Sequence, residues 1–147
     1  MPILNPETLC QVAFVVHDLD AAIKKYQETF GFGEPSFIQT EGYAKTRATY
    51  NGNPMDGTAR LAFFKAGQIE IELIQPDDQP SVWREHLDER GEGVHHIAFF
   101  VKDSVATEAA LEPLGIPVKQ KGYGDDGGSY CYLDSAPKLG VMIELLE

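Results

Sequence analysis

Two short apolar segments of the chain share the same order of apolar and polar positions. Residues 11–18 (QVAFVVHD) align without a gap with residues 96–103 (HIAFFVKD). Each is a run of β-branched and aromatic residues that ends in Asp, a pattern that predicts a buried strand followed by a helix capped by the Asp. A pattern that occurs twice in one chain indicates an internal repeat. After Asp18 we expect a helix over 19–30, and its buried face should consist of Ala22, Ile23, Tyr26 and Phe30.

The remaining elements extend this repeat over most of the chain. In the first half we expect strands near 35–40 and 44–50, and a hairpin of strands over 59–65 and 68–75. The second half is expected to contain a strand over 94–102, a helix over 104–114, and strands over 116–121, 129–134 and 140–146. Each half therefore has the order strand, helix, three strands. We predict an α+β fold in which each half forms a curved mixed sheet with its helix on the outside.

The length of 147 residues is typical of one domain. We expect a single domain made of two repeats, about 10–76 and 94–147, joined by residues 77–93 with a short helix over 81–90. The segment 51–57 (NGNPMDG) is dense in turn-forming residues. It is either a hairpin loop or a lid beside a binding site, and the sequence does not separate these two interpretations.

Four polar side chains interrupt the apolar strands at equivalent places in the two repeats. Gln11 and His96 stand at the head of the first strand of each half, and Glu72 and Glu144 lie in the last strand of each half. An acid in an apolar strand either faces solvent or meets a compensating charge. Because the same pattern occurs twice, we favour convergence of the four side chains around a pseudo-twofold axis. Oxygen and imidazole donors of this kind predict a site for one divalent ion.

The other three histidines receive different predictions. His95 is expected to point to the face of its strand opposite to His96, in a surface position or a position that supports the metal ligand. His17 and His86 are expected to be solvated. Two cysteines are too few for a disulfide framework.

The charge of the chain limits its partners. The net charge is −11 and the pI is about 4.7, which argues against nucleic acid and against an anionic membrane, since both need clustered Lys and Arg. A small anionic substrate remains possible, because it needs only a metal or a few local cations. The N-terminus has no signal-peptide pattern and no segment is long and apolar enough for a membrane span, so a cytoplasmic location is expected.

The double motif, the repeated order of elements and the closing Ile-Glu-Leu resemble the vicinal oxygen chelate superfamily, which includes glyoxalase I, methylmalonyl-CoA epimerase, extradiol dioxygenases and antibiotic-resistance proteins. The resemblance covers residues 10–147 and implies two βαβββ modules that wrap a metal. Residues 91–99 (GEGVHHIAF) and 26–31 (YQETFG) are most similar to the epimerase. The chain departs from it in having Gln11 where a His is usual and in having no acid within 59–64 (ARLAFF).

The resemblance implies a metal held by Gln11, Glu72, His96 and Glu144, with Ni, Co, Zn, Mn or Mg all compatible with this set. It implies a lyase or isomerase that transfers a proton next to the carbonyl of a small carbonyl or thioester substrate, with Glu144 as the base and Glu72 as the candidate for the opposite face. A homodimer is the default assembly. The alternative is a binding or resistance protein of the same fold without chemistry.

Further residues are candidates for contact with a substrate. Arg60 could pair with a substrate carboxylate or phosphate if it faces the cavity, and the alternative is a surface cation on a strand edge. Tyrosines that could line the cavity, or simply pack, are Tyr43, Tyr50, Tyr123 and Tyr130.

Overall fold

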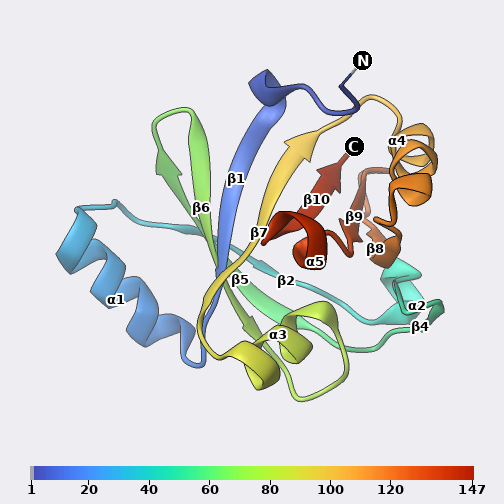
Figure 1. The fold of residues 1–147 in the computed structure, drawn as a ribbon. Coiled ribbons are helices and arrows are strands. Elements are labelled where there is room, and N and C mark those ends of the chain that lie inside the picture. The colour runs from blue at the N-terminus through green and yellow to red at the C-terminus, as the bar shows by residue number, and fades with distance from the viewer. Residues whose placement is uncertain (1) are drawn as a thin grey trace.

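The computed structural model describes residues 2–147 and contains one mixed sheet of ten strands that curls into a half-barrel (Figure 1). The strand order is β2-β5-β6-β1-β7-β10-β9-β8-β3-β4. The strands are β1 (Leu9–Val15), β2 (Ser36–Gln39), β3 (Thr49–Tyr50), β4 (Asn53–Pro54), β5 (Ala59–Ala66), β6 (Ile69–Pro76), β7 (Gly93–Phe100), β8 (Val118–Tyr123), β9 (Ser129–Leu133) and β10 (Met142–Leu146). The helices are η1 (Pro6–Thr8), α1 (Leu19–Phe30), α2 (Tyr43–Thr46), α3 (Val82–Arg90), α4 (Ser104–Leu111), η2 (Glu112–Leu114) and α5 (Ala136–Leu139).

Two βαβββ modules meet at the centre of this sheet. The first consists of β1, α1, β2, β5 and β6, and the second of β7, α4, β8, β9 and β10. The leading strands β1 and β7 pair antiparallel with each other, and each pairs in parallel with the last strand of its own module. The predicted α+β fold with two modules in a curved mixed sheet is therefore confirmed.

The aspartates that follow the two leading strands act as predicted. The side chain of Asp18 accepts a hydrogen bond from the backbone N–H of Ala21 at 3.0 Å, and that of Asp103 accepts one from Ala106 at 2.9 Å. Each thereby satisfies one of the free N–H groups of a helix N-terminus. The same cap at the same place fixes the strand-to-helix turn in both modules.

The segment between β2 and β5 departs from the prediction. Residues 44–50 were expected to form a strand, but the first part is the short helix α2, and only Thr49 and Tyr50 are extended. Asn51 and Gly52 both have positive φ, which a tight hairpin turn between β3 and β4 requires. The segment 51–57 thus begins as a hairpin loop. Because β3 pairs with β8, the whole segment crosses from the first module to the far edge of the second.

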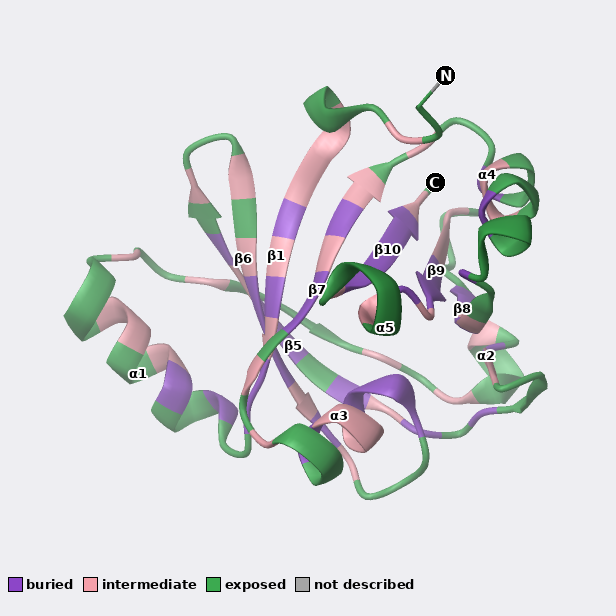
Figure 2. Cartoon of the chain, in the orientation of Figure 1, coloured by how far each residue is buried: buried purple, intermediate pink, exposed green. Residues whose placement is uncertain are grey.

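Three apolar clusters hold the fold together, one inside the curved sheet and two outside it. Buried residues lie mainly on the strands, whereas α1 and α4 consist mostly of exposed and intermediate residues (Figure 2). The inner cluster receives Val82, Trp83 and Leu87 from α3. The outer clusters lie under α1 and beside α4. One predicted member of the α1 face is wrong: Phe30, the last residue of the helix, is 61% exposed and contacts mainly the neighbouring Tyr26 and Phe32 rings. Within residues 2–147, none of the helices has the length and apolar character that a membrane crossing requires.

Trp83 should be the most costly single truncation in the inner cluster. Its side chain is buried and its indole N–H donates a hydrogen bond to the Tyr132 hydroxyl at 3.0 Å. We expect Trp83→Ala to lower the free energy of unfolding by about 3–5 kcal/mol, because a large cavity and an unpaired hydroxyl remain. Urea denaturation of both proteins measures this loss, and a decrease below about 1 kcal/mol would contradict it.

Cys131 should be inert in the folded protein. Burial raises the pKa of its thiol, and the nearby Glu108 carboxylate raises the pKa further. Since the thiolate is the reactive form, we expect no labelling of Cys131 by iodoacetamide at about pH 8 and full labelling in denaturant. Mass spectrometry of the alkylated peptide tests this, and equal labelling rates in the two states would refute it.

Candidate metal centre

The four polar residues singled out by the repeat lie on four adjacent strands of the sheet. Gln11 comes from β1, Glu72 from β6, His96 from β7 and Glu144 from β10. The register aligns them, because Ala13 pairs with Glu72 on one side and with His96 on the other. All four side chains point to the concave face, and each of the four residues is at most 5% exposed. We call these four residues the candidate centre.

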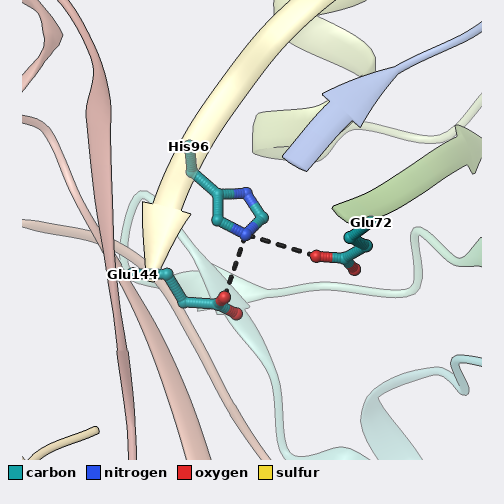
Figure 3. A group of neighbouring side chains, drawn as sticks. All are labelled: Glu72, His96 and Glu144. Carbon is teal, nitrogen blue, oxygen red and sulfur yellow. Dashed lines mark ion pairs between the residues drawn. The ribbon is translucent and has the colours of Figure 1, made fainter. Parts of the chain in front are cut away.

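The imidazole of His96 stands between the two carboxylates (Figure 3). Its Nε2 lies 2.9 Å from Oε2 of Glu144 and 3.3 Å from Oε2 of Glu72. One donor atom from each of the three residues falls within 4.8 Å of the other two. The amide oxygen of Gln11 lies 3.1 Å from the same Nε2. Four potential ligand atoms therefore converge on one buried point.

The charges in the candidate centre stabilise one another. Burial disfavours a charge on His96, but the Glu144 and Glu72 carboxylates outweigh this effect and raise the pKa of His96 to about 9. Burial also raises the pKa of Glu72; the Glu144 charge adds to this, while His96 opposes it. In the absence of a metal, a protonated His96 thus bridges two acids, and a divalent cation would replace its Nε2 proton.

The orientation of the Gln11 amide tests whether these residues fit a cation. Its oxygen faces two carboxylate acceptors, at 2.8 Å from Glu72 Oε2 and 3.1 Å from Glu144 Oε2. Turning the amide would let its NH₂ group donate to both carboxylates. With the oxygen inward, two carboxylate oxygens, an amide oxygen and an imidazole nitrogen present lone pairs to one point. This donor set fits a divalent ion.

A cavity of about 440 Å³ opens above the candidate centre. Glu72, Glu144 and Gln11 line it, whereas His96 is fully buried beneath them. Its walls are largely apolar and aromatic, and Lys45 of α2 is the one basic side chain in its lining. A cavity of this size and character accommodates a small organic ligand.

The tyrosines predicted from the sequence divide into two groups. Tyr123 and Tyr130 line the cavity. Tyr50 instead packs against the inner cluster, and Tyr43 is exposed on α2; neither lines the cavity. Tyr50 is turned away because β3 pairs with β8 and places its side chain against the core.

Arg60 faces away from the cavity. It alternates along β5 with Leu61 and Phe63, which line the cavity, so its own side chain lies on the outer face. There it forms an ion pair with Asp20 of α1 at 3.3 Å, and 46% of its side chain is exposed. The expectation that Arg60 faces the cavity is therefore wrong, and the alternative of a surface cation describes it.

We expect Arg60→Ala to leave activity and metal affinity unchanged. An exposed ion pair contributes about 0–1 kcal/mol, so the loss in stability should be small as well. Steady-state kinetics and a thermal melt test both statements. A rise in KM above about threefold would show that Arg60 reaches the substrate after all.

The position of His95 corrects a second expectation. His95 does not point to the opposite face: its Nδ1 lies 2.8 Å from Nδ1 of His96, and its side chain is buried. The cause is a β-bulge, because Ala13 pairs with His96 while Phe14 pairs with Val94, which leaves His95 without a ladder partner. A bulge turns two successive side chains to the same face of a strand.

The remaining histidines were predicted to be solvated, and only His17 is exposed. His86 is half-buried against the His95 ring, with its Nδ1 buried and without a hydrogen-bond partner. Burial lowers the pKa of His86, and the Arg90 charge lowers it further.

Sequence reasoning missed Tyr132, Trp83 and Glu70 as parts of the cavity lining. The Tyr132 ring packs edge-on against His96, with ring centroids 5.0 Å apart. Its alternation with Tyr130 on strand 129–133 was a usable signal, since both must share a face. Trp83 had no such signal, because the position of α3 inside the curved sheet depends on tertiary packing.

Comparison with known proteins identifies the family. A model of the glyoxalase/bleomycin resistance protein/dioxygenase superfamily matches residues 10–132. The chain belongs to this superfamily. The predicted resemblance is thereby confirmed. A curated relative, the uncharacterized protein YqjC of Bacillus subtilis, is 30% identical over 89 residues, which span 59% of this chain and 64% of that protein.

Solved structures of methylmalonyl-CoA epimerases share the fold. The enzyme from Mycobacterium tuberculosis is 25% identical with a TM-score of 0.67, covering 95% of this chain and 87% of its own. The Streptomyces coelicolor epimerase, as a variant in complex with 2-nitronate-propionyl-CoA, is 26% identical with a TM-score of 0.66 and coverage of 95% of both chains. A hypothetical protein from Bacillus halodurans, at 21% identity and a TM-score of 0.66, shows the fold alone.

Proposed function

We propose that this protein is a divalent-metal-dependent enzyme that transfers a proton at a carbon next to a carbonyl, in the manner of an epimerase or a glyoxalase-type lyase. The observation that carries the proposal is the buried Glu72–His96–Glu144 group at the base of a cavity. Burying two acids is costly, and their placement at equivalent positions of the two modules favours a functional reason. The similarity to methylmalonyl-CoA epimerases supports an epimerase-like reaction on a carbonyl or thioester substrate.

The four residues of the candidate centre would hold the ion, with Gln11 and His96 as neutral ligands and the two acids as charged ligands. A divalent ion at this point would polarise the substrate carbonyl and lower the energy of the negative charge that develops when the proton leaves. The two positive charges of the ion would be balanced by the two carboxylates, which leaves the site close to neutral before the substrate binds.

The proton itself would be moved by Glu144. Its carboxylate lines the cavity and is buried, so it meets a bound substrate away from water. A carboxylate with one oxygen free of other partners can remove an α-proton and return it to the same or a neighbouring carbon.

Glu72 is the candidate for the opposite face of the substrate. It lines the same cavity from β6. In the strand order β6-β1-β7-β10, β1 and β7 lie between β6 and the strand β10 that carries Glu144. The neighbouring strand β5 offers only Leu61 and Phe63 to the cavity, so it contributes no acid there. In a two-base epimerisation Glu72 would act as the second acid, while a one-base proton shuttle needs only Glu144.

Metal analysis combined with solvent-exchange NMR tests the proposal. We expect about one divalent ion per chain in the purified protein, and deuterium uptake from D₂O at the α-carbon of methylmalonyl-CoA or of the hemithioacetal of methylglyoxal. If the protein binds a metal but exchanges the α-proton of neither compound, its substrate is a different molecule. A failure to bind any metal after reloading would overturn the enzyme proposal in favour of a binding protein of the same fold.

Three statements about the whole protein stay predictions. These are the homodimer, the cytoplasmic location, and the single domain whose repeats are joined by residues 77–93. Sedimentation velocity tests the first, and coincidence of unfolding transitions followed by different probes tests the last.

A further inference from the structure

The bulge in β7 places a second histidine directly behind the candidate metal ligand. His95 contacts His96 through the two Nδ1 atoms, 2.8 Å apart, and it packs edge-on against the Tyr132 ring. A distance of 2.8 Å between two nitrogens requires one proton between them. Which ring carries that proton decides which nitrogen of His96 is available to bind a metal.

The far side of His95 answers this question. Its Nε2 lies 3.2 Å from the carbonyl oxygen of Val82 in the first turn of α3. A carbonyl oxygen can only accept, so Nε2 of His95 must carry a proton and donate it. In a neutral imidazole the other nitrogen is then an acceptor. The proton between the two rings therefore sits on Nδ1 of His96.

The alternative arrangement would make His95 the cation. In that case both of its nitrogens would donate, and Nδ1 of His96 would accept. The surroundings of His95 are against this: it is enclosed by Tyr132, His86 and the start of α3, with no carboxylate among the partners of its ring. The two carboxylates lie on the other side of His96.

The carbonyl that holds His95 is itself fixed. Ser81 caps α3 through a hydrogen bond from the N–H of Arg84 at 3.0 Å. The N–H of Val82 donates to the buried side chain of Gln120 at 2.9 Å. The acceptor for His95 thus belongs to a helix end that is anchored on β8 of the second module. These hydrogen bonds hold the Val82 carbonyl in place.

We propose that His95 is a positioning residue, which accepts a hydrogen bond from Nδ1–H of His96 and so keeps the Nε2 lone pair of His96 directed at the candidate centre. The chain runs from His96 to His95 to the Val82 carbonyl. Metal-binding histidines usually donate their second N–H to a carboxylate or a carbonyl. Here a second imidazole takes that place, and the bulge is the structural device that brings it there. This inference rests on the proposed function only in assuming that the Nε2 lone pair binds a metal. The assignment of the two tautomers does not depend on it.

Two substitutions separate the hydrogen bond from simple packing. In His95→Asn, the side-chain oxygen occupies the position of Nδ1 and can still accept from His96. In His95→Leu, a side chain of similar bulk offers no acceptor. We expect the affinity for Zn²⁺, measured by calorimetry, to fall about 10–100-fold in His95→Leu and to stay within about threefold of the native value in His95→Asn. Equal losses in both variants, or no loss in His95→Leu, would overturn the proposal.

A second measurement does not depend on metal binding or on either variant. Nitrogen-15 NMR of the histidine-labelled, metal-free native protein reports which ring nitrogen carries a proton. We expect His95 as the neutral tautomer protonated at Nε2, and His96 with a proton on Nδ1. A proton on Nδ1 of His95 would refute the proposal even if Zn²⁺ binds. If the native protein binds no metal but shows these tautomers, the proposed function fails while the hydrogen-bond chain stands.

Discussion

Replacing Glu144 by Gln should abolish most of the catalysis while keeping the metal. A general base contributes about 10²–10⁴-fold to a proton transfer, and we expect α-proton exchange to fall by that factor. The amide is nearly the same size as the carboxylate, and its oxygen could bind the ion, as is proposed for the amide oxygen of Gln11. The loss should therefore appear in kcat at almost constant metal content, measured by exchange NMR and metal analysis of the same sample.

The control for this variant is the same chemical change at a distant position. Glu112 is exposed in η2, outside the cavity lining, so Glu112→Gln alters the net charge equally without touching the site. We expect native exchange rates from it. If Glu144→Gln loses the metal together with activity, Glu144 acts first as a ligand. If it retains both, the base is a different residue, and Glu72→Gln becomes the decisive variant.

The candidate centre could be predicted from the sequence because the chain repeats itself. A single Glu in an apolar strand is ambiguous, since it can simply face solvent. Glu72 and Glu144 occur at equivalent places, and strands with equivalent neighbours must turn equivalent faces to the core. The symmetry therefore supplied the tertiary information that one strand alone lacks, and the structure brings all four residues together.

The orientation of Arg60 could not be predicted for the opposite reason. Both faces of β5 are apolar: Leu61 and Phe63 face the cavity, and Ala62 and Phe64 pack under α1. A strand covered on both sides has no alternation that distinguishes inside from outside. Only the docking of α1, which brings Asp20 to Arg60, decides the direction of the side chain.

The bulge at His95 could not be predicted from the sequence either. Strand alternation assigns neighbouring residues to opposite faces, and one extra residue in the ladder reverses this rule locally. The bulge follows from how β7 pairs with β1, which is a long-range property. The short helix α2 was not predicted because residues 43–46 carry no local helix signal. They follow Gly42 and have neither a helical apolar stripe nor a side-chain cap.

Metal binding should raise the melting temperature, and this effect should depend on His96. An ion at a thousand times its dissociation constant stabilises the folded state by about 4 kcal/mol if it binds the native state alone. For a chain of this length, that corresponds to an increase of about 8–16 °C. A thermal melt with each of Ni²⁺, Co²⁺, Zn²⁺, Mn²⁺ and Mg²⁺ would also rank the ions, and a chelator should reverse the shift.

Two variants show whether the shift arises at the candidate centre. In His96→Gln, the ring between the two carboxylates is lost, and we expect the metal-induced shift to fall below about a quarter of the native value, since one ligand and its orientation disappear. Glu70→Gln is the matched control, because Glu70 lines the same cavity from β6 but is not among the three clustered residues. Its shift should equal that of the native protein. A full shift in His96→Gln would mean that the ion binds other carboxylates of this acidic chain, and the assignment of the centre would then be wrong.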